Sequence, residues 1–389
     1  MKHNDKPGVY ITGSGQLKVE KFSPLSLREM GAKSIRLAME DANVEKVDAL
    51  YVGNMLSGIM SHQQQLGPIV ASEAGLNGIE AVTLEAACGS GGAALRNGFM
   101  SIMSGQCDTV VVCGVEQMSH ADKAFITQSI ATASDWEIEG GRGHSFVTLN
   151  AGLMQSYIDA YKISPDLFAM FGVNAHHNAN KNLHALFHKE ITVEDYIQAK
   201  FLYHSLRMFD ASPICDGSAA LVLSKNPPTS NDRPIVKITA SAAATEHVGI
   251  AKRLHPLHAD GIKRSGMKAL AMSGITIDEI DFFELHDAYS IIATLSLEAM
   301  GFAKPGEGWK LAVDGEICIN GKIPISTFGG LKARGHPIGA SGVYQAVEAY
   351  AQLTGLAGAN QITKIPRVGL IQSIGGTASS VFTHVLLSE

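Results

Sequence analysis

The residues with the clearest chemical potential lie in one turn, residues 85–92, between a short apolar strand and a helix. Cys88 stands where the helix begins. The free N–H groups and partial positive charge of a helix N-terminus favour a thiolate, Gly89 and Gly91 let a ligand approach the backbone, and Ser90 is a candidate cap. The pattern therefore predicts a nucleophilic cysteine, although a cysteine in such a place is more often a small buried hydrophobe.

The same turn fits a second motif loosely. Residues 89–94 read G-x-G-x-x-A, as in a dinucleotide-binding loop that follows a strand and opens a helix. That fingerprint also requires an acidic residue at the end of the next strand, about 20 residues on. Here Asp108 comes before the strand and Glu116 comes late. The nucleotide-cofactor alternative is therefore the weaker of the two.

Composition limits the class of protein. The chain has 389 residues, which suggests two or three domains and a large core. Hydrophobic residues make up 46% and charged residues 17%, and 40 glycines suit a compact α/β enzyme with many tight strand-to-helix turns. A formal net charge of -6 and the lack of a polybasic stretch disfavour a nucleic-acid partner.

Cysteine usage and the chain start indicate the compartment. The five cysteines include no C-x-x-C pair, so we expect free thiols in a reducing compartment and predict a cytoplasmic protein. Residues 1–7 lack the apolar core of a signal peptide, and no apolar run approaches the length of a membrane helix. We therefore expect no membrane association.

The order of predicted elements occurs twice along the chain. In the first half we predict strands at 9–12, 49–52, 82–87, 108–114 and 219–224 and helices at 26–42 and 88–104. In the second half the same order returns, with strands at 235–239, 280–284, 323–328, 368–372 and 381–387 and helices at 267–273 and 342–353. Strands that alternate with helices are typical of a parallel sheet covered on both faces. The repeat predicts two like halves.

Residues 119–206 have no counterpart in the second half, so we interpret them as an inserted, mainly helical loop domain. The first half is then 1–118, completed by 207–230, and the second half is 231–389. The insert holds four histidines whose spacing permits a metal cluster, at positions 176, 177, 184 and 188. No cysteine or carboxylate pattern surrounds them, so we interpret them as a solvated helix face and predict no metal site.

Three further turns occupy matching positions at the carboxyl ends of predicted strands, where open α/β sheets gather their active sites. They are His286-Asp287-Ala288-Tyr289, residues 335–342 in Gly-His-Pro-Ile-Gly-Ala-Ser-Gly, and residues 373–377 in Ser-Ile-Gly-Gly-Thr. A single histidine is weak evidence, because most are structural. Together with Cys88 in the other half, these turns form a Cys/His arrangement suited to acyl transfer.

With these residues the chain resembles the thiolase family along nearly its whole length. The run Gly335-His336-Pro337-Ile338-Gly339, with Cys88-Gly89-Ser90, is highly specific for that family. His286-Asp287 in place of the usual Asn-Glu is similar to sterol-carrier-protein type thiolases and their archaeal acetoacetyl-CoA relatives. The resemblance implies the thiolase fold, in which two βαβαβαββ halves form a five-layered α-β-α-β-α core. It also implies a coenzyme A thioester as substrate, no tightly bound cofactor, and a homodimer or dimer of dimers.

The resemblance also assigns roles. Cys88 is implied as the nucleophile that takes the acyl group, and His336 as the group that draws off its proton and holds the thioester oxygen. His286 is implied to order the oxyanion hole for the second substrate's enolate, while the N–H groups of Cys88 and Gly375 hold the oxygen of the acyl-enzyme. Further candidate binding residues are His144, Asp287 and Ser373.

One departure from the family affects the chemistry. Most thiolases use a second cysteine to move the proton at the substrate's α-carbon, either before the final glycines or inside the His-Asp-x-aromatic motif. This chain has Ser373 at the first place and Ala288 at the second. A serine hydroxyl is a much poorer acid or base near neutral pH. Condensation then requires His286, His336 or a thiol brought in by folding, such as Cys318.

The leading hypothesis is a thiolase-type acyl-CoA C-acyltransferase that condenses two acetyl-CoA, or cleaves a 3-ketoacyl-CoA, through an acyl-Cys88 intermediate. One alternative passes the acyl group from coenzyme A to a non-CoA acceptor, as the thiolase-like subunit of the phloroglucinol acetyltransferase complex does. Another is a degenerate thiolase that acts as a complex subunit with a zinc-ribbon and OB-fold partner. Acyl length, direction of reaction and oligomeric state are open at the level of sequence.

Overall fold

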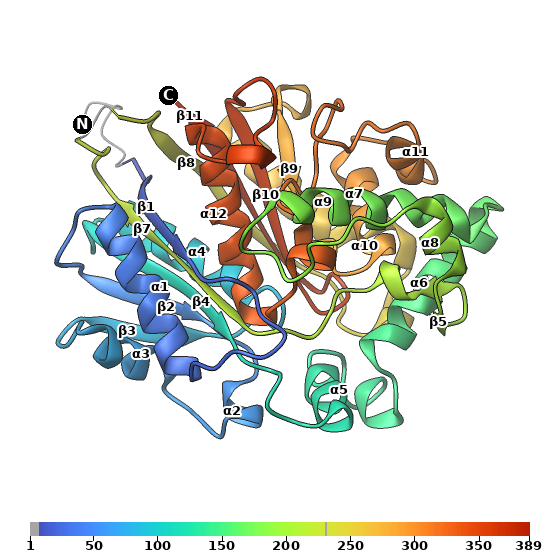
Figure 1. Cartoon of the computed structure of the whole chain (residues 1–389), viewed down its shortest axis with the longest axis horizontal. Coiled ribbons are helices and arrows are strands. Elements are labelled where there is room, and N and C mark those ends of the chain that lie inside the picture. The colour runs from blue at the N-terminus through green and yellow to red at the C-terminus, as the bar shows by residue number, and fades with distance from the viewer. Residues whose placement is uncertain (1–7, 230–231) are drawn as a thin grey trace.

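The computed structural model describes residues 8–229 and 232–389 (Figure 1). The predicted boundary at 230/231 and the start at residues 1–7, expected to lack a signal-peptide core, lie outside the described residues. In the part of the chain that is described, no helix combines the length and apolar character needed to cross a bilayer.

The strands and helices follow the order expected from the repeat. The strands are β1 (Tyr10–Gln16), β2 (Ala49–Gly53), β3 (Glu80–Leu84), β4 (Thr109–Glu116), β5 (Phe201–Tyr203), β6 (Leu206–Arg207), β7 (Gly217–Ser224), β8 (Val236–Thr245), β9 (Phe282–Glu284), β10 (Val368–Gly375) and β11 (Ser380–Ser388). The helices are α1 (Leu27–Asp41), α2 (Ser57–Met60), α3 (Leu66–Ala74), α4 (Ser90–Met103), α5 (Lys123–Ala131), α6 (Phe146–Tyr161), α7 (Ala169–Lys181), α8 (Val193–Gln198), α9 (Asp260–Ser273), α10 (Ser290–Met300), α11 (Gly308–Val313) and α12 (Ser341–Thr354).

The main sheet shows the two-fold repeat directly. Its strand order is β3-β2-β4-β7-β1-β8-β11-β10-β9, so that β2-β4-β7-β1 in one half is mirrored by β9-β10-β11-β8 in the other. The halves meet where β1 pairs antiparallel with β8, at Tyr10 with Lys237 and Ile11 with Val236. The strand predicted at 323–328 makes only one parallel bridge, Ile325 to Phe283, and is therefore a distorted counterpart of β3.

Helices and sheet halves form the expected five layers. Helix α4 packs on β2 and β4 of its own half and also on β10 and β11 of the other, while α12 packs on β10 and on β4 and β7. Helix α1 contacts β1, β7 and β4 on the outer side of the first half, and α9 contacts β8 and β11 on the outer side of the second. Figure 1 shows α12 running through the middle of the molecule. The predicted α-β-α-β-α arrangement is therefore confirmed.

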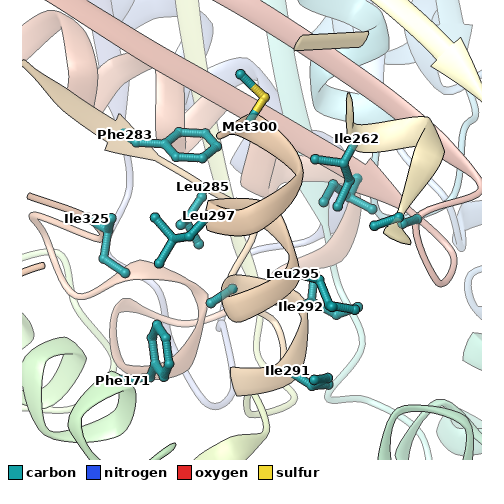
Figure 2. Close-up of a cluster of buried hydrophobic side chains, with 14 of the residues drawn as sticks. Phe171, Ile262, Phe283, Leu285, Ile291, Ile292, Leu295, Leu297, Met300 and Ile325 are labelled. Atoms are coloured by element: carbon teal, nitrogen blue, oxygen red, sulfur yellow. The ribbon is translucent and has the colours of Figure 1, made fainter. Parts of the chain in front are cut away.

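A hydrophobic cluster around α10 holds the second half together (Figure 2). Phe283 from β9, Ile325 from the distorted strand and Leu297 of α10 belong to it. Phe171 of α7, from the inserted segment, is part of the same cluster. The insert therefore lies between β4 and β7 of the first half in sequence, but its side chains pack in the core of the second half. Its limits, 119–206, stay predictions, because burial does not separate it as an independent unit.

The N-termini of α4 and α12 touch through their backbones. A Cβ atom added at Gly342 would lie 2.5 Å from the backbone nitrogen of Gly92 and 2.7 Å from Oγ of Ser373. A Cβ at Gly91 would lie 2.9 Å from the nitrogen of Val343. Glycine is therefore required on both helices for this close approach.

We expect Gly342→Ala to lower the free energy of unfolding by about 2 kcal/mol, because an extra methyl group must push two packed helices apart. Gly152→Ala on α6 is the matched control, since its added Cβ meets nothing within 4 Å. The control should raise stability by about 0.5 kcal/mol, because alanine restricts the unfolded chain more than glycine. Guanidinium unfolding followed by circular dichroism measures both. Equal effects of the two substitutions would contradict the close contact.

Candidate active site

Cys88 lies in a tight turn between β3 and α4. Ala87 has a φ of 53°, in the left-handed region that side chains other than glycine adopt rarely. The Ser90 hydroxyl closes the turn, because it donates to the carbonyl of Ala87 (2.6 Å) and accepts from the N–H of Ala86 (3.0 Å). Ser90 is therefore not the N-cap expected from the sequence. The cap position is Gly89, which has no side chain to bond the helix.

The surroundings of Cys88 favour a thiol and not the thiolate predicted from the helix N-terminus. The residue is only 7% exposed. Burial, followed by the negative charge of Glu116, raises the pKa of the Cys88 thiol to about 12. Backbone N–H groups of Cys88 and Gly376 directed at the sulfur act in the opposite sense on this pKa, but they do not outweigh burial. The sequence-based expectation is corrected here, because tertiary burial and a neighbouring carboxylate are not visible in a local motif.

The loop that carries His336 is fixed by two glycines. Gly335 has a φ of +114°, and a Cβ atom there would lie 2.6 Å from Cγ1 of Val19. Gly339 donates its N–H to Oε2 of Glu116 at 3.1 Å. Since Glu116 ends β4 in the first half, this bond ties the histidine loop of the second half to the half that carries Cys88.

Hydrogen bonds indicate which nitrogen of His336 carries the proton. Nδ1 lies 2.7 Å from Oγ of Ser341, and that hydroxyl donates to the carbonyl of Pro337 at 3.2 Å. This pattern favours a proton on Nδ1 and leaves the lone pair on Nε2, which has no partner among the described residues. Burial, followed by the influence of His286 and Arg334, lowers the pKa of His336 well below its usual value. The side chain is therefore a neutral imidazole able to accept a proton.

His286 follows β9 and has the opposite arrangement. Its Nδ1 accepts a hydrogen bond from the N–H of Ile374 at 3.4 Å, so the proton of the neutral ring lies on Nε2. Burial, followed by the positive charge of Arg334, lowers the pKa of His286 to about 3. The rings of His286 and His336 meet edge to face, with centroids 5.1 Å apart.

The three side chains converge in one place. The sulfur of Cys88 and one ring nitrogen each of His286 and His336 all lie within 4.8 Å of one another. They line a cavity of about 230 Å³ whose other walls are largely apolar, among them Met118, Phe146, Ile214, Ile292 and Ile338. Such a set matches zinc ligands in type. However, the Nε2 proton of His286 opposes coordination, so the arrangement favours acyl transfer.

The other predicted residues lie around this cavity and not in its wall. Gly375 packs against the carbonyl of Ala86, whereas the next residue, Gly376, lines the cavity. Asp287 is buried and accepts the N–H of Leu331 at 2.7 Å, which fixes the chain before the histidine loop.

Ser373 and His144 also lie outside the wall of this cavity. Ser373 packs between α4 and α12, where its Oγ would lie 2.7 Å from a Cβ at Gly342. His144 is exposed and lines a neighbouring open hollow with Trp136. The two hollows share Lys123, Thr127 and Ser145, so His144 lies in a hollow that adjoins the cavity.

Glu116 is a site residue whose role the sequence did not reveal. Its two oxygens accept from the N–H groups of Met55 (2.9 Å), Leu56 (3.2 Å) and Gly339 (3.1 Å) and from Nδ2 of Asn54 (2.8 Å). Burial raises the pKa of Glu116 to about 7, although these donors act in the opposite sense. An acidic residue at the end of a buried valine-rich strand was the available signal.

Gln345 of α12 is a second such residue. Its Nε2 donates to three carbonyls, those of Glu284 (3.0 Å), Leu285 (2.8 Å) and Gln372 (3.1 Å). It therefore joins the end of β9 to the inside of β10, the two strands that lead to His286 and Gly376. A glutamine inside a helical pattern gave no sign of this role.

The histidines of the insert do not form one solvated helix face. His176 is buried, stacks on Phe187 with centroids 5.5 Å apart, and bonds the carbonyl of Lys189. Helix α7 ends at Lys181, so His184 and His188 are outside any helix. The interpretation as a helix face was wrong because the packing of this segment on the second half is not encoded in its periodicity.

Comparisons with known proteins agree with this geometry. The model of the thiolase N-terminal domain matches residues 9–227, and that of the thiolase C-terminal domain-like family matches residues 242–388. The chain is 38% identical to an acetyl-CoA acetyltransferase of Methanothermobacter thermautotrophicus, covering 97% of this chain and 98% of that one. It is 34% identical to an acetyl-CoA acetyltransferase of Methanocaldococcus jannaschii, with the same coverage.

A more distant relative is sterol carrier protein 2 of Homo sapiens, 25% identical over 96% of this chain and 71% of that protein. A solved structure, titled "Ltp2-ChsH2(DUF35) aldolase", shares the fold with a TM-score of 0.83 at 21% identity, covering 99% of both chains. The two family models together span most of the chain, and the archaeal relatives match it almost end to end. The chain therefore belongs to the thiolase family.

Proposed function

We propose that this protein is a thiolase-type acyl-CoA C-acyltransferase that condenses two acetyl-CoA, or cleaves a 3-ketoacyl-CoA, through an acyl-Cys88 intermediate. The observation that carries the proposal is the convergence of the Cys88 sulfur with two buried imidazoles, within 4.8 Å, in the wall of one cavity. The relatives named acetyl-CoA acetyltransferase, at 38% and 34% identity, support the choice of an acyl-CoA substrate.

In the first half-reaction the sulfur of Cys88 attacks the carbonyl carbon of the thioester while its proton moves to Nε2 of His336. The tetrahedral intermediate then collapses, and the bond to the coenzyme A sulfur breaks. The imidazolium of His336 returns the proton to that sulfur, which leaves as free coenzyme A. Acyl-Cys88 and a neutral His336 remain, so atoms and charges balance.

The oxygen of the intermediate needs donors that are already in place. The N–H groups of Cys88 and Gly376, both directed at the sulfur, support an oxyanion site at this position in place of the predicted Cys88 and Gly375 pair. The Nε2 proton of His286 is suited to the oxygen of the second substrate's enolate. A neutral donor keeps its proton through the reaction, and burial of His286 maintains that state.

The second half-reaction, which moves a proton at the α-carbon, is the less well supported step. Ala288 lines the cavity but offers no thiol, Ser373 packs away from it, and Cys318 does not line it. Only the two imidazoles remain as candidate bases among the groups proposed from the sequence. This observation favours a second candidate function, in which acyl-Cys88 passes its acyl group to a non-CoA acceptor without α-proton removal.

We further propose a cytoplasmic homodimer or dimer of dimers. Strand β3 ends the main sheet and is largely exposed, with Val82 at 39% exposure, so its free edge suits pairing with a second copy. All five cysteines are free thiols, as a reducing compartment favours. The alternative is that this chain is a degenerate thiolase that acts as a subunit of a complex with a zinc-ribbon and OB-fold partner. It predicts stable co-purification of a second polypeptide without acylation of Cys88.

Alkylation of Cys88 tests the protonation state. Because the pKa of this thiol is raised to about 12, the thiolate fraction grows with pH, and the rate of iodoacetamide labelling should rise about tenfold per pH unit between pH 7 and pH 9. Mass spectrometry of the Cys88 peptide measures the rate. Cys88→Ala gives the background from the remaining cysteines, including the half-buried Cys318. A plateau below pH 8 would show a stabilised thiolate.

Thiolysis tests the activity itself. With acetoacetyl-CoA and free coenzyme A, the wild-type protein should form acetyl-CoA, and Cys88→Ala should lose at least a factor of about 10³ because no covalent intermediate can form. The loss of the absorbance of the acetoacetyl-CoA enolate measures the rate, because thiolysis consumes the 3-keto group. Equal rates for the two proteins would remove the proposal. Acetylated Cys88 without any acetoacetyl-CoA turnover would instead support transfer to a non-CoA acceptor.

Restoring a thiol tests the second half-reaction. We expect Ala288→Cys to raise the rate of acetoacetyl-CoA formation from acetyl-CoA by at least about tenfold, since position 288 lines the cavity and a thiol there can move the α-proton. Ser373→Cys, which places a thiol between α4 and α12, should leave the rate unchanged or lower. A wild-type protein that condenses as fast as Ala288→Cys would show that the imidazoles suffice.

A further inference from the structure

Asn150, on the first turns of α6, faces the cavity that holds Cys88. The residue is 2% exposed, so its polar atoms have little access to bulk water. Its Nδ2 donates to the carbonyl of Phe146 at 2.8 Å, one helical turn earlier. Its Oδ1 has no hydrogen-bond partner among the described residues. A buried acceptor without a partner therefore belongs to a residue that lines this cavity.

The bond to Phe146 fixes which way the amide points. If the amide were turned over, Oδ1 would face the carbonyl oxygen of Phe146, and two acceptors would oppose each other. The oxygen of Asn150 therefore points away from the carbonyl of Phe146. A buried carbonyl without a donor is costly, and such groups in native proteins usually have a partner that binds them.

The cavity wall also carries donors, among them Thr127, Ser212 and Tyr289, but none of them bonds Oδ1 of Asn150. Phe146, Val147 and Ile292, which line the same cavity, carry apolar side chains. The neutral imidazoles already have their own tasks, since His286 faces the reacting centre and His336 presents a lone pair. A donor carried by a ligand in the cavity would satisfy the oxygen of Asn150.

We propose that Oδ1 of Asn150 accepts a hydrogen bond from an N–H or O–H group of the bound thioester, and so selects substrates that carry a donor at this depth. The inference rests on the proposed function, because it takes the cavity to be the thioester site. Two groups supply that chemistry: an amide N–H of the pantetheine arm of coenzyme A, or a hydroxyl on the acyl chain.

The experiment measures the half-saturating concentration for acylation of Cys88, followed by mass spectrometry, with acetyl-CoA, butyryl-CoA and 3-hydroxybutyryl-CoA. Asn150→Leu removes the acceptor at similar volume. Asn97→Leu is the matched control, since Nδ2 of Asn97 makes the same bond, to the carbonyl of Ala93 at 2.9 Å, but Asn97 does not line the cavity. Thermal unfolding of both variants checks that they fold.

If the donor is the pantetheine amide, Asn150→Leu should raise the half-saturating concentration about tenfold for all three thioesters. If the donor is the acyl hydroxyl, only 3-hydroxybutyryl-CoA should show that rise, and butyryl-CoA should be unchanged. If Asn150→Leu keeps the wild-type half-saturating concentration for all three thioesters, the inference is overturned while the proposed function stays intact. A wild-type Cys88 that none of the thioesters acylates would remove both.

A second measurement leaves the protein unaltered, in case Asn150→Leu does not fold. The acylation rate of wild-type Cys88 is compared within two pairs of thioesters. The first pair is the acetyl thioester of N-acetylcysteamine and its N-methylated form, which lacks the amide donor. The second pair is 3-hydroxybutyryl-CoA and butyryl-CoA, which lacks the hydroxyl. A preference of about tenfold for the donor-bearing member of either pair supports the inference. No preference within either pair overturns it.

Discussion

The backbone contact between the N-termini of α4 and α12 is the constraint on which the rest of the structure depends. Gly91 and Gly92 lie against Gly342 with no side chain between them, so both helices fit between the two halves of the sheet. Cys88 comes just before α4, and the loop of His336 comes just before α12. The contact therefore brings Cys88 and His336 together, although 248 positions separate them along the chain. Glu116 and Gln345 hold the remaining loops onto this frame by hydrogen bonds to backbone groups.

Burial sets the protonation states at the meeting point. It raises the pKa of the Cys88 thiol and lowers the pKa values of both His286 and His336, so all three groups are neutral at rest. The imidazoles of His286 and His336 hold their protons on different nitrogens, because a backbone N–H bonds Nδ1 of His286 and the Ser341 hydroxyl bonds Nδ1 of His336. Charged groups lie behind them, as in the buried pair of Arg334 and Glu348 at 3.0 Å. A site of this kind creates charge only as the reaction proceeds, which avoids holding an unpaired buried ion in the resting protein.

Sequence patterns predicted most of the strands, the central helices and the three side chains that converge in the cavity. Strand alternation and helical spacing are local properties, so the repeat was visible without coordinates. Predictions that depended on side-chain direction did less well. Ser373 and Asp287 stand in motifs beside the site, yet one packs between helices and the other fixes a turn. The ionised state expected for Cys88 was also wrong, because the helix N-terminus is visible in the sequence, whereas the burial and Glu116 are not.

By itself the sequence determined that a cysteine and two histidines follow strands of a repeated α/β pattern, since turn residues and hydrophobic periodicity act over a few positions. Only the tertiary structure decided that the inserted segment packs on the second half and that Ala288 and not Ser373 lines the cavity. It also decided that Asn150, in the wall of that cavity, holds a buried acceptor without a partner. The physical reason is that packing between distant segments fixes which side chain faces a cavity and which nitrogen of a ring keeps its proton. Those contacts join residues whose spacing along the chain carries no information about their distance in space.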